Sequence, residues 1–317
     1  MRVRSKRIIN AVKIQNEVRQ KGKFVVPVIV DEDKSLNYEG YSWIMKVMRI
    51  PIVSILNILP ASWGRFILTV FSNNRWGAKA VCRWATTYKA LEAIYTYSER
   101  RSKGEISITD FFWGSFLSNS RAVRNRLKLV KRELLTAIEQ VKERKSEINL
   151  MSLGCGSARA IVEVLAQVNG ILPIKTKLID INRGAISFSK KLATIYNVNQ
   201  IEWHQDYAQN LEKYCNDFQP DIVEMIGLLD YYSDEQAIDL LRKIYKVLSP
   251  GGWLITCNIR SNLERPFVTK TVNWPMIYRS PKQLASILIE AGFRVEYLKI
   301  IYEPLKIHGV AIAQKVV

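Results

Sequence analysis

Cysteine and histidine are scarce in this sequence, and their scarcity excludes several classes of site. The four cysteines stand at positions 82, 155, 215 and 257, and no two of them form a C-x-x-C pair. With only two histidines, His204 and His308, the chain has no zinc or iron–sulfur ligand spacing. Four cysteines in 317 residues are also too few for a disulfide scaffold. We therefore expect a reduced, cytoplasmic protein without a bound metal.

Long apolar runs are also missing. The longest uncharged run near the N-terminus lies between Arg49 and Arg65 and contains two prolines, Pro51 and Pro60. Its 15 residues fall short of the roughly 20 that a membrane-spanning helix needs. The basic cluster at the start of the chain is not followed by an apolar segment. The sequence therefore predicts neither a membrane span nor a signal peptide.

Acidic residues are few in the first half of the chain. Residues 1–147 carry 28 Lys and Arg against 13 Asp and Glu, whereas residues 148–317 carry 19 against 16. Such a surplus of positive charge favours an anionic partner, which can be a membrane surface, a nucleic acid or an acidic small molecule. The plainer alternative is a solvated basic face that only keeps the protein soluble.

The N-terminal half is predicted to be mainly helical. Residues 24–30 have the pattern of a short strand, and residues 41–97 predict several helices that break near Pro51, Pro60 and residues 72–74. The polar residues 98–104 predict a hinge. The clearest helix covers residues 118–145, with an apolar stripe at helical spacing. Its opposite face is basic, and we expect most of these side chains to be solvated: Arg121, Arg124, Arg126, Lys128, Lys131 and Arg132.

From residue 148 onward, short apolar runs alternate with helical stretches. Strands are expected at 148–153, 177–181, 201–204, 221–226, 253–258, 295–301 and 309–314, and helices at 158–168, 185–196, 234–248 and 281–291. This alternation predicts an α/β domain with a parallel sheet and helices on both faces. Ligands of such sheets bind at the carboxyl ends of the strands, so the residues after each strand are the candidates for a site.

The first of these strand ends carries a glycine loop, Gly154-Cys155-Gly156, followed by a helix. Gly154 permits a sharp turn, and Gly156 lets the backbone lie against a ligand where a side chain would collide. Two ligands are compatible with this loop, a dinucleotide and S-adenosylmethionine (SAM). The dinucleotide pattern G-x-G-x-x-G places its third glycine at Arg159, and a bulky residue there opposes a close approach of the pyrophosphate.

Three further segments follow in the order expected for such a site. Asp180 ends the next strand, where a carboxylate accepts hydrogen bonds from the ribose hydroxyls of either ligand. Asp206 and Tyr207 follow the third strand, where a carboxylate can accept from an adenine amino group. A Pro-Gly-Gly turn at 250–252 then leads from a helix into a strand.

The segments Leu-Gly-Cys-Gly, Ile-Asp, Gln-Asp, Pro-Asp-Ile-Val and Leu-Ser-Pro-Gly-Gly together resemble the class I SAM-dependent methyltransferases over residues 148–317. The resemblance implies a Rossmann-like sheet of seven strands with the last one antiparallel, here preceded by the basic helical region. It implies SAM as methyl donor and S-adenosyl-L-homocysteine as product. The cofactor contacts that it implies are Gly154, Cys155, Gly156, Asp180, Ile181, Asp206, Tyr207, Ile226 and Gly227.

The chain departs from the family pattern at two positions. Ser152 stands where the family usually has an acidic residue, and Ala158 stands where it often has a third glycine. The first change affects how the methionine amino group is held. Three residues are candidates to reach the SAM carboxylate: Arg159, Asn119 and Arg121.

A finer resemblance concerns the segments 227–232 and 273–279. They are similar to a bacterial subgroup that includes hydroxy-fatty-acid carboxyl methyltransferases, with Gly-Leu-x-Asp-Tyr and Trp-x-x-Ile-Tyr-Arg in the same places. This resemblance implies an acidic lipid-like or other small-molecule acceptor. Arg265 and Arg279 are then candidates to hold its carboxylate, and Trp274 and Tyr278 to contact it. The structural alternatives are that the two aromatic residues belong to the core and that Arg279 pairs with Asp230.

The candidate catalytic residues are Asp230 and Tyr231, at the end of the fourth strand, and His308 near the last strand. A carboxylate acceptor needs no base, whereas a hydroxyl or amine acceptor needs one such as His308 or Asp230. Each also has a structural interpretation, since a histidine at a strand end is often packed. Cys155 is interpreted as a small packing residue and not as a nucleophile.

We expect three segments: a helical, basic cap or recognition region at 1–110, an amphipathic connecting helix at 111–147 and a SAM-binding domain at 148–317. The leading hypothesis is methyl transfer to a small or lipid-like acceptor, on a carboxylate or a hydroxyl, by an enzyme that associates with an anionic membrane surface. One alternative is a nucleic-acid (RNA) methyltransferase that binds through its basic half. Another is a partner protein that binds SAM without catalysis.

Overall fold

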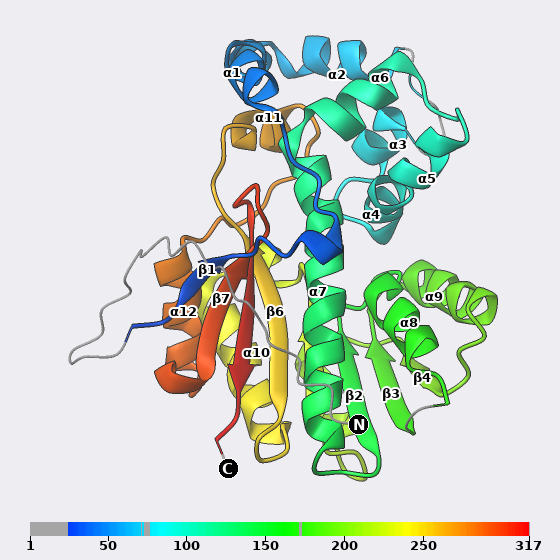
Figure 1. The fold of residues 1–317 in the computed structure, drawn as a ribbon, viewed down its shortest axis with the longest axis vertical. Helices are drawn as coiled ribbons and strands as arrows, with labels where there is room; N and C mark the ends of the chain where they lie inside the picture. Colours follow the sequence, from blue (N-terminus) through cyan, green and yellow to red (C-terminus); the bar gives the residue numbers. More distant parts are fainter. Residues whose placement is uncertain (1–24, 71, 73–76, 171–172, 317) are drawn as a thin grey trace.

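The computed structural model describes residues 25–70, 72, 77–170 and 173–316. A central sheet with helices on both faces forms one half of the molecule, and a group of short helices forms the other (Figure 1). The long helix α7 (Ser118–Lys142) runs from this helical group down along the sheet and so belongs to both halves. The predicted basic cluster within the first ten residues lies outside the described residues.

The sheet has eight strands in the order β1-β7-β8-β6-β5-β2-β3-β4. All neighbours are parallel except β8, which runs antiparallel to β6 and β7. The strands are β1 (Val28–Val30), β2 (Ile148–Leu153), β3 (Ile174–Ile179), β4 (Ile201–His204), β5 (Ile222–Met225), β6 (Trp253–Ile259), β7 (Leu298–Tyr302) and β8 (His308–Gln314).

The predicted α/β Rossmann-like fold is confirmed, with one strand more than the seven that the resemblance implies. The additional strand is β1, which comes from the N-terminal region and pairs in parallel with β7, Val28 opposite Ile300. Residues 295–297, which we expected to open a strand, form a 3-10 turn, and β7 begins at Leu298.

Five helices cover the two faces of the sheet. Because side chains alternate along a strand, β2 directs Ile148 and Leu150 to one face and Met151 and Leu153 to the other. The first face is covered by α7, α8 (Arg159–Gln167) and α9 (Arg183–Ile195), and the second by α10 (Asp234–Val247) and α12 (Pro281–Glu290). Each face therefore has its own apolar core.

The helical group, here called the cap, consists of α1 (Trp43–Ile58), α2 (Ala61–Thr69), α3 (Ala78–Arg83), α4 (Tyr88–Tyr95), α5 (Tyr97–Ser102), α6 (Ile108–Phe111), a π-helical turn (Phe112–Phe116) and α11 (Arg265–Lys270). This confirms a mainly helical N-terminal region. Val53, Leu56, Leu68, Phe267 and Val268 meet in one buried cluster. The cap is thus built from the N-terminal region together with a segment that follows β6.

Several details of the N-terminal prediction are wrong. Pro51 lies inside α1 instead of ending it; Pro51 and Val47 both face solvent, so water can bond the carbonyl that loses its helical partner. The expected hinge at 98–104 is largely the helix α5. The break at Pro60 is confirmed, whereas residues 73 and 74 of the third predicted break lie outside the described residues. The strand expected at 24–30 is limited to Val28–Val30, and residue 24 is not described.

The basic face of α7 is less solvated than predicted. Arg124 and Arg126 are both buried, because the cap folds over this end of the helix. Arg124 donates to both carboxylate oxygens of Glu39, at 2.6 Å each, and to the carbonyl of Gly114. In the described part of the chain, no helix is long and apolar enough to cross a membrane.

Candidate active site

The glycine loop lies at the carboxyl end of β2, in the middle of the sheet. Gly154 and Gly156 have φ angles of +62° and +56°, in the left-handed region that disfavours other residues. The amides of Gly154 and Cys155 both donate to the carbonyl of Ile179, at 2.8 and 3.2 Å, which fixes the loop against β3. Cys155 packs beneath the loop, and burial raises the pKa of its thiol well above the usual value. The backbone of the loop thus faces outward.

Asp180 stands directly after β3 and beside this loop. Its carboxylate accepts from the amides of Gly156, at 2.8 Å, and Asn182, at 2.7 Å, and burial raises its pKa. One bond goes to each oxygen, and a carboxylate can accept about four. Asp180 therefore keeps acceptor capacity for a ligand with hydroxyl donors.

The carboxylate of Asp206, which follows β4, has more hydrogen-bond donors around it than that of Asp180. It accepts from the amide of Tyr207 and from the side chains of Asn210, Lys213 and Tyr214, at 2.6 to 3.2 Å. These hydrogen bonds, the one from Asn210 foremost, hold its pKa well below the usual range. The carboxylate is therefore largely saturated by donors of its own chain.

One cavity of about 320 Å³ extends from these strand ends to the underside of the cap. Its outer end is lined by the loop and strand-end residues Gly154, Gly156, Asp180, Ile181, Asp206, Tyr207, Ile226 and Gly227. Its inner end is lined mainly by apolar and aromatic side chains, including Leu91, Ile94, Trp113, Val123, Val268, Trp274 and Met276. A polar compartment and an apolar compartment are thus continuous.

Several buried polar atoms that line this cavity have no partner. Among the described residues, nothing bonds either ring nitrogen of His308, the hydroxyl of Ser120 or the indole nitrogen of Trp113. Burial, with a smaller effect of Arg126, holds the pKa of His308 well below its usual value, so its imidazole is neutral. Buried polar groups are nearly always hydrogen-bonded in folded proteins, and these groups therefore indicate a ligand with polar atoms of its own.

Arg126 is the only Lys or Arg among the described residues that line the cavity. Its guanidinium donates to the hydroxyl of Tyr95 at 3.1 Å and contacts the thiol of Cys257 at 3.8 Å, and its Nε has no partner. Nη1 would lie 3.7 Å from a Cβ atom at Gly227, so this cation stands at the end of β5. A buried, incompletely bonded cation at this place is a candidate anion-binding group.

Asp230 and Tyr231 also line the cavity. The carboxylate of Asp230 accepts from the side chain of Asn258, at 2.6 Å, and the amide of Ile259, at 2.8 Å, and burial raises its pKa to about 6. The hydroxyl of Tyr231 accepts from the indole nitrogen of Trp274 at 2.7 Å. The structure thus brings these residues together with His308 around one space.

Three of the predicted acceptor contacts do not line this cavity, namely Arg265, Tyr278 and Arg279. Arg279 is buried and donates to Asp234 and Asn258 and to two backbone carbonyls, but not to Asp230. Arg265 is exposed, with its guanidinium 4.5 Å from the ring centre of Tyr278.

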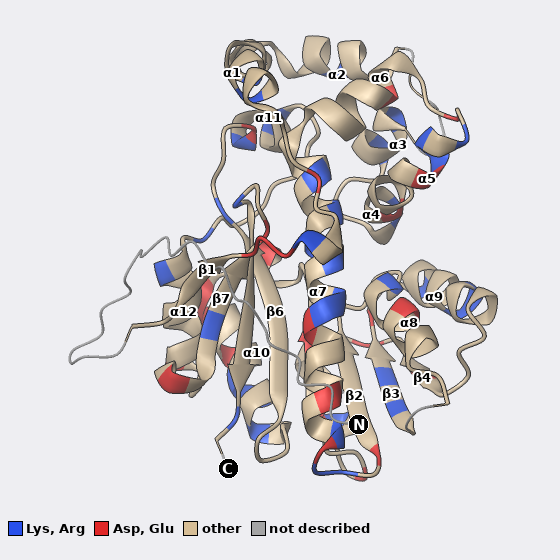
Figure 2. Ribbon diagram, in the orientation of Figure 1, with Lys and Arg blue, Asp and Glu red and all other residues tan. Residues whose placement is uncertain are grey.

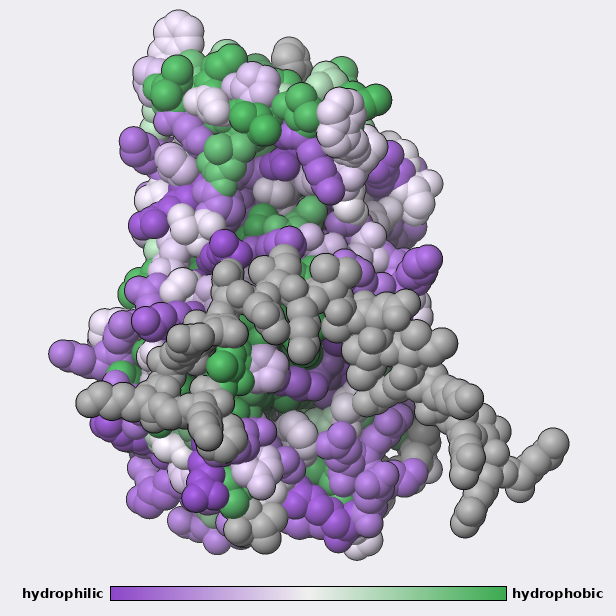
Figure 3. Space-filling model, turned by 60° about the vertical axis from the view of Figure 1, so that its left-hand side comes forward, coloured by the Kyte–Doolittle hydropathy of each residue, from purple (hydrophilic) through white to green (hydrophobic). Residues whose placement is uncertain are grey.

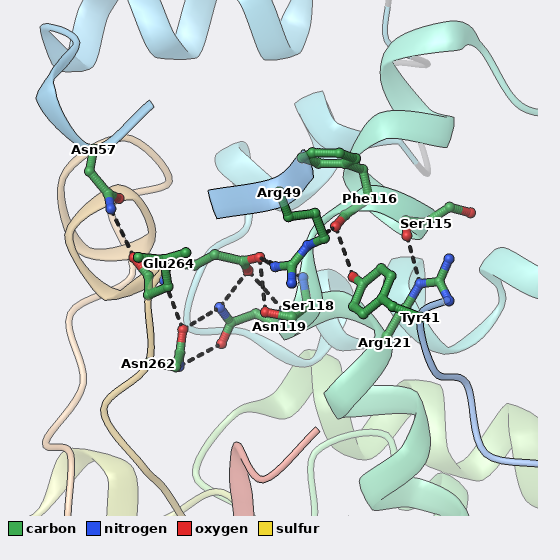
Figure 4. A network of polar contacts seen from close by, with 11 residues as sticks. Tyr41, Arg49, Asn57, Ser115, Phe116, Ser118, Asn119, Arg121, Asn262 and Glu264 are labelled. Atoms are coloured by element: carbon green, nitrogen blue, oxygen red, sulfur yellow. Dashed lines mark hydrogen bonds and ion pairs between the residues drawn. The ribbon is translucent and has the colours of Figure 1, made fainter. Parts of the chain in front are cut away.

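The three candidates for the SAM carboxylate are engaged elsewhere. Arg159 bonds Glu92 of α4 and Glu163. Asn119 bonds the carboxylate of Glu264, and Arg121 donates to the carbonyls of Ser115 and Gly40. Figure 4 shows the bonds from Asn119 to Glu264 and from Arg121 to Ser115. Arg126 is the residue that the sequence analysis missed. The prediction that Arg126 lies on the basic face of α7 was wrong. Its spacing of three or four residues from Val123 and Val130 places it within the apolar stripe, and this signal was present in the sequence.

The departure at Ser152 is matched by an acidic residue on the neighbouring strand. Ser152 lies opposite Glu224 of β5, and its hydroxyl donates a short hydrogen bond to the Glu224 carboxylate. Burial raises the pKa of Glu224 to about 7. A titratable carboxyl thus lies next to the position where the resemblance leads one to expect an acid.

Residues 150–252 match the family model described as a methyltransferase domain. No curated protein matches the chain. The crystal structure of a possible exported protein from Bordetella parapertussis aligns with a TM-score of 0.63 at 16% identity, over 86% of this chain and 97% of that one. The SAM-dependent methyltransferase SibL, in its apo form, aligns with a TM-score of 0.51 at 17% identity, over 87% and 75%. At these identities the likeness shows the fold alone.

Proposed function

We propose that the chain is a SAM-dependent methyltransferase that acts on a small acceptor with an apolar body. One observation carries the proposal: a single cavity joins the Gly154–Gly156 loop and Asp180 to an apolar compartment that contains unpartnered polar atoms. The match of residues 150–252 to a methyltransferase domain supports the same reaction class.

The outer compartment suits SAM by the chemistry of its residues. Gly156 leaves the loop backbone accessible, and Asp180 retains acceptor capacity for ribose hydroxyls. A dinucleotide is less suitable, because Arg159 at the start of α8 is held by carboxylates where that pattern needs a glycine. Arg126 is the cation available for the carboxylate of the amino-acid tail or for an acidic group of the acceptor.

The inner compartment supports a lipid-like or aromatic acceptor. Its lining is apolar except for a few groups, among them Ser120, Trp113, His308 and Arg126, and such sparse polar groups orient a ligand inside an apolar pocket. An acidic lipid-like acceptor of the kind methylated by the hydroxy-fatty-acid subgroup is compatible with this lining.

When bound, SAM supplies an electrophilic methyl group on a sulfonium. The chain's own part is to align the acceptor atom with the methyl group and to exclude water under the cap. For a hydroxyl acceptor it must also accept the proton that the hydroxyl loses. His308 is neutral and buried, so its imidazole can accept a proton from a hydroxyl acceptor. Asp230 is the second candidate for this role, and a carboxylate acceptor requires neither.

The test has two arms. Calorimetric titration with S-adenosyl-L-homocysteine is expected to show binding by the native chain and at least about tenfold weaker binding by Asp180→Asn, because a hydrogen bond to a charged group is worth about 1.5–3 kcal/mol. The control is Asp239→Asn, an exposed acid of α10 away from the cavity. Unchanged affinity in Asp180→Asn contradicts the proposed cofactor site.

The second arm uses SAM with a labelled methyl group and two acceptor pools, a lipid and small-molecule extract and total RNA. We expect label in the lipid or small-molecule fraction. Stoichiometric label in RNA would favour the nucleic-acid alternative, and binding without transfer to either pool would favour a non-catalytic partner protein. The cavity lining, with one cation, gives the nucleic-acid alternative no specific support.

A further inference from the structure

The outer surface of the cap is apolar to an unusual degree. Helix α1 buries only Val53 and Leu56, although most of its residues are apolar. Figure 3 shows hydrophobic residues gathered at the cap end of the molecule. The outer face, as we define it, comprises the exposed apolar residues of α1 and α2: Trp43, Ile44, Val47, Met48, Ile50, Ile55, Ile58, Trp63, Phe66 and Ile67.

The most exposed members of this face are large. Ile58 is 81% exposed, Trp43 77%, Trp63 67% and Phe66 66%. Helices that are apolar on all sides are normally buried, and contiguous exposed apolar patches of this kind mark interaction sites. The outer face therefore requires a partner with apolar groups to cover it.

The same segment has no negative charge. Residues 40–91 contain no Asp or Glu, and they contain seven Lys and Arg. In Figure 2 neither α1 nor α2 shows an acidic residue. Lys46 of α1 and Arg65 of α2 are exposed beside the apolar side chains, and Arg65 also donates from Nε to the carbonyl of Thr271 at 3.1 Å. The partner must therefore combine apolar depth with a negative surface.

We propose that the outer face docks the protein on an anionic lipid bilayer, with α1 and α2 lying in the plane of the membrane surface. Tryptophan is enriched at the boundary between headgroups and acyl chains, and Trp43 and Trp63 are placed to lie there. Lys46 and Arg65 then face anionic headgroups, and each such charge is worth about 1 kcal/mol near the surface. The protein is held on the bilayer without crossing it.

A second copy of the chain suits this face less well. A symmetric dimer places the same patch on both sides, so the Lys46 and Arg65 side chains of both copies would share one interface. No acidic residue within residues 40–91 is available to neutralise them. Bringing like charges together opposes association, whereas an anionic bilayer neutralises them.

The outer face and the cavity share one buried cluster of side chains. The buried cluster that anchors α1 and α2, through Val53, Leu56 and Leu68, also contains Trp113 and Val268, which line the inner compartment. Docking would therefore place the roof of that compartment next to the lipid. Delivery of a lipid-like acceptor by this route rests on the proposed function, whereas docking itself does not.

The test is flotation of the full chain with vesicles of neutral phosphatidylcholine, alone or with about one third phosphatidylserine. We expect strong flotation with the anionic vesicles and at least tenfold weaker partitioning into the neutral ones. Trp63→Ser with Phe66→Ser is expected to abolish flotation. Lys46→Gln with Arg65→Gln is expected to weaken partitioning into anionic vesicles roughly 25-fold, at about fivefold per charge.

Matched controls lie on the sheet half of the molecule. Ile195→Ser removes an apolar side chain that is 73% exposed on α9, and Lys191→Gln with Lys282→Gln removes two exposed charges of α9 and α12. Both are expected to float like the native chain, and thermal unfolding checks that all variants are folded. Flotation that is absent, or equally reduced in the controls, overturns the proposal. So does a native dimer in sedimentation velocity that the Trp63 and Phe66 changes convert to a monomer.

Because flotation does not measure methyl transfer, it separates the two proposals. A chain that floats but neither binds S-adenosyl-L-homocysteine nor transfers a methyl group would contradict the proposed function alone. A chain that is active on a small acceptor but does not float would contradict the docking alone.

Discussion

The buried carboxylate of Glu264 links α1 of the cap to the first residues of α7 and accepts from five donors. Glu264 accepts from the guanidinium of Arg49 in α1 by a short ion pair. It also accepts from the amides of Ser118 and Asn119, at 2.6 and 3.0 Å, and from both of their side chains (Figure 4). Leu117, the residue before α7, provides no side-chain cap. Glu264 therefore caps α7 from a distant part of the chain, at its positive end.

We predict that Glu264→Gln lowers the free energy of unfolding by about 3–5 kcal/mol. The amide of glutamine removes the charge and presents two donors to a site that already contains five donors. Arg49 is only 11% exposed at its side chain, and a buried cation left without its partner costs about 3–5 kcal/mol. The melting temperature should fall by about 5–8 °C, at roughly 1.5 °C per kcal/mol, because the entropy of unfolding is about 2.1 cal/mol/K per residue.

Urea unfolding of the purified chain measures this loss. The control is Glu99→Gln, which breaks the exposed pair with Lys103 in the same cap and is expected to cost less than about 0.5 kcal/mol. Arg49→Met with Glu264→Gln removes the unpaired cation and should be at least about 1 kcal/mol more stable than the sum of the single changes predicts. A Glu264→Gln loss below about 1 kcal/mol, or strict additivity of the two changes, refutes the reasoning.

Three further predictions concern one carboxyl next to the site and two residues that line the cavity. Burial raises the pKa of Glu224 to about 7, above its usual value of 4.5. The protonated carboxyl therefore stabilises the fold below pH 4.5, and this contribution is lost as the pH rises through 7. The Glu224→Gln variant does not titrate at this position, so in urea unfolding it should gain stability relative to the native chain between pH 5 and pH 8, and a stability difference that stays constant with pH would contradict this. Arg126→Met should weaken the binding of a ligand whose carboxylate contacts Arg126 about 10- to 100-fold. Calorimetry with S-adenosyl-L-homocysteine and with 5′-methylthioadenosine, which lacks the carboxylate, shows whether the cofactor is that ligand. His308→Asn should lower the rate of methyl transfer about 10²- to 10⁴-fold with a hydroxyl acceptor. Because the imidazole stays neutral, protonation of His308 should not lower the native rate between pH 8 and pH 6. An inflection of the rate near pH 6.5 that disappears in the variant would count against a buried, neutral histidine.

The sheet and the glycine loop could be predicted because their determinants are local in sequence. Each of the parallel strands β2 to β6 is a short apolar run that a helical segment follows, and the loop lies at one such junction, from Gly154 to Gly156. The position of Asp180 follows from the same rule, since the carboxyl ends of parallel strands share one edge. No long-range information is needed to bring these residues together.

The acceptor side of the cavity could not be predicted in this way. It is assembled from α4, α7, β8 and the segment after β6, which are far apart in sequence. Arg265 and Arg279 were the candidate cations because the finer resemblance implies an acidic acceptor. In the structure Arg265 is exposed, and the guanidinium of Arg279 is fully engaged in hydrogen bonds. Arg126 lies in a helix in which Arg121 and Arg124 bond backbone carbonyls of the cap, and only packing shows which arginine faces the cavity.

Arg159 connects the choice of cofactor to the architecture of the cap. In the sequence it stands where a dinucleotide pattern requires glycine, which disfavours a dinucleotide as the ligand. In the structure it has a role of its own, because its guanidinium donates to Glu92 of α4, a buried residue of the cap, and to Glu163 of α8. The cap is thus fastened to the sheet at the glycine loop by Arg159 and to α7 by Glu264. A roof fixed at both places cannot lift as a whole without breaking buried ion pairs, so we expect a ligand to enter through the cavity mouth while the cap stays in place.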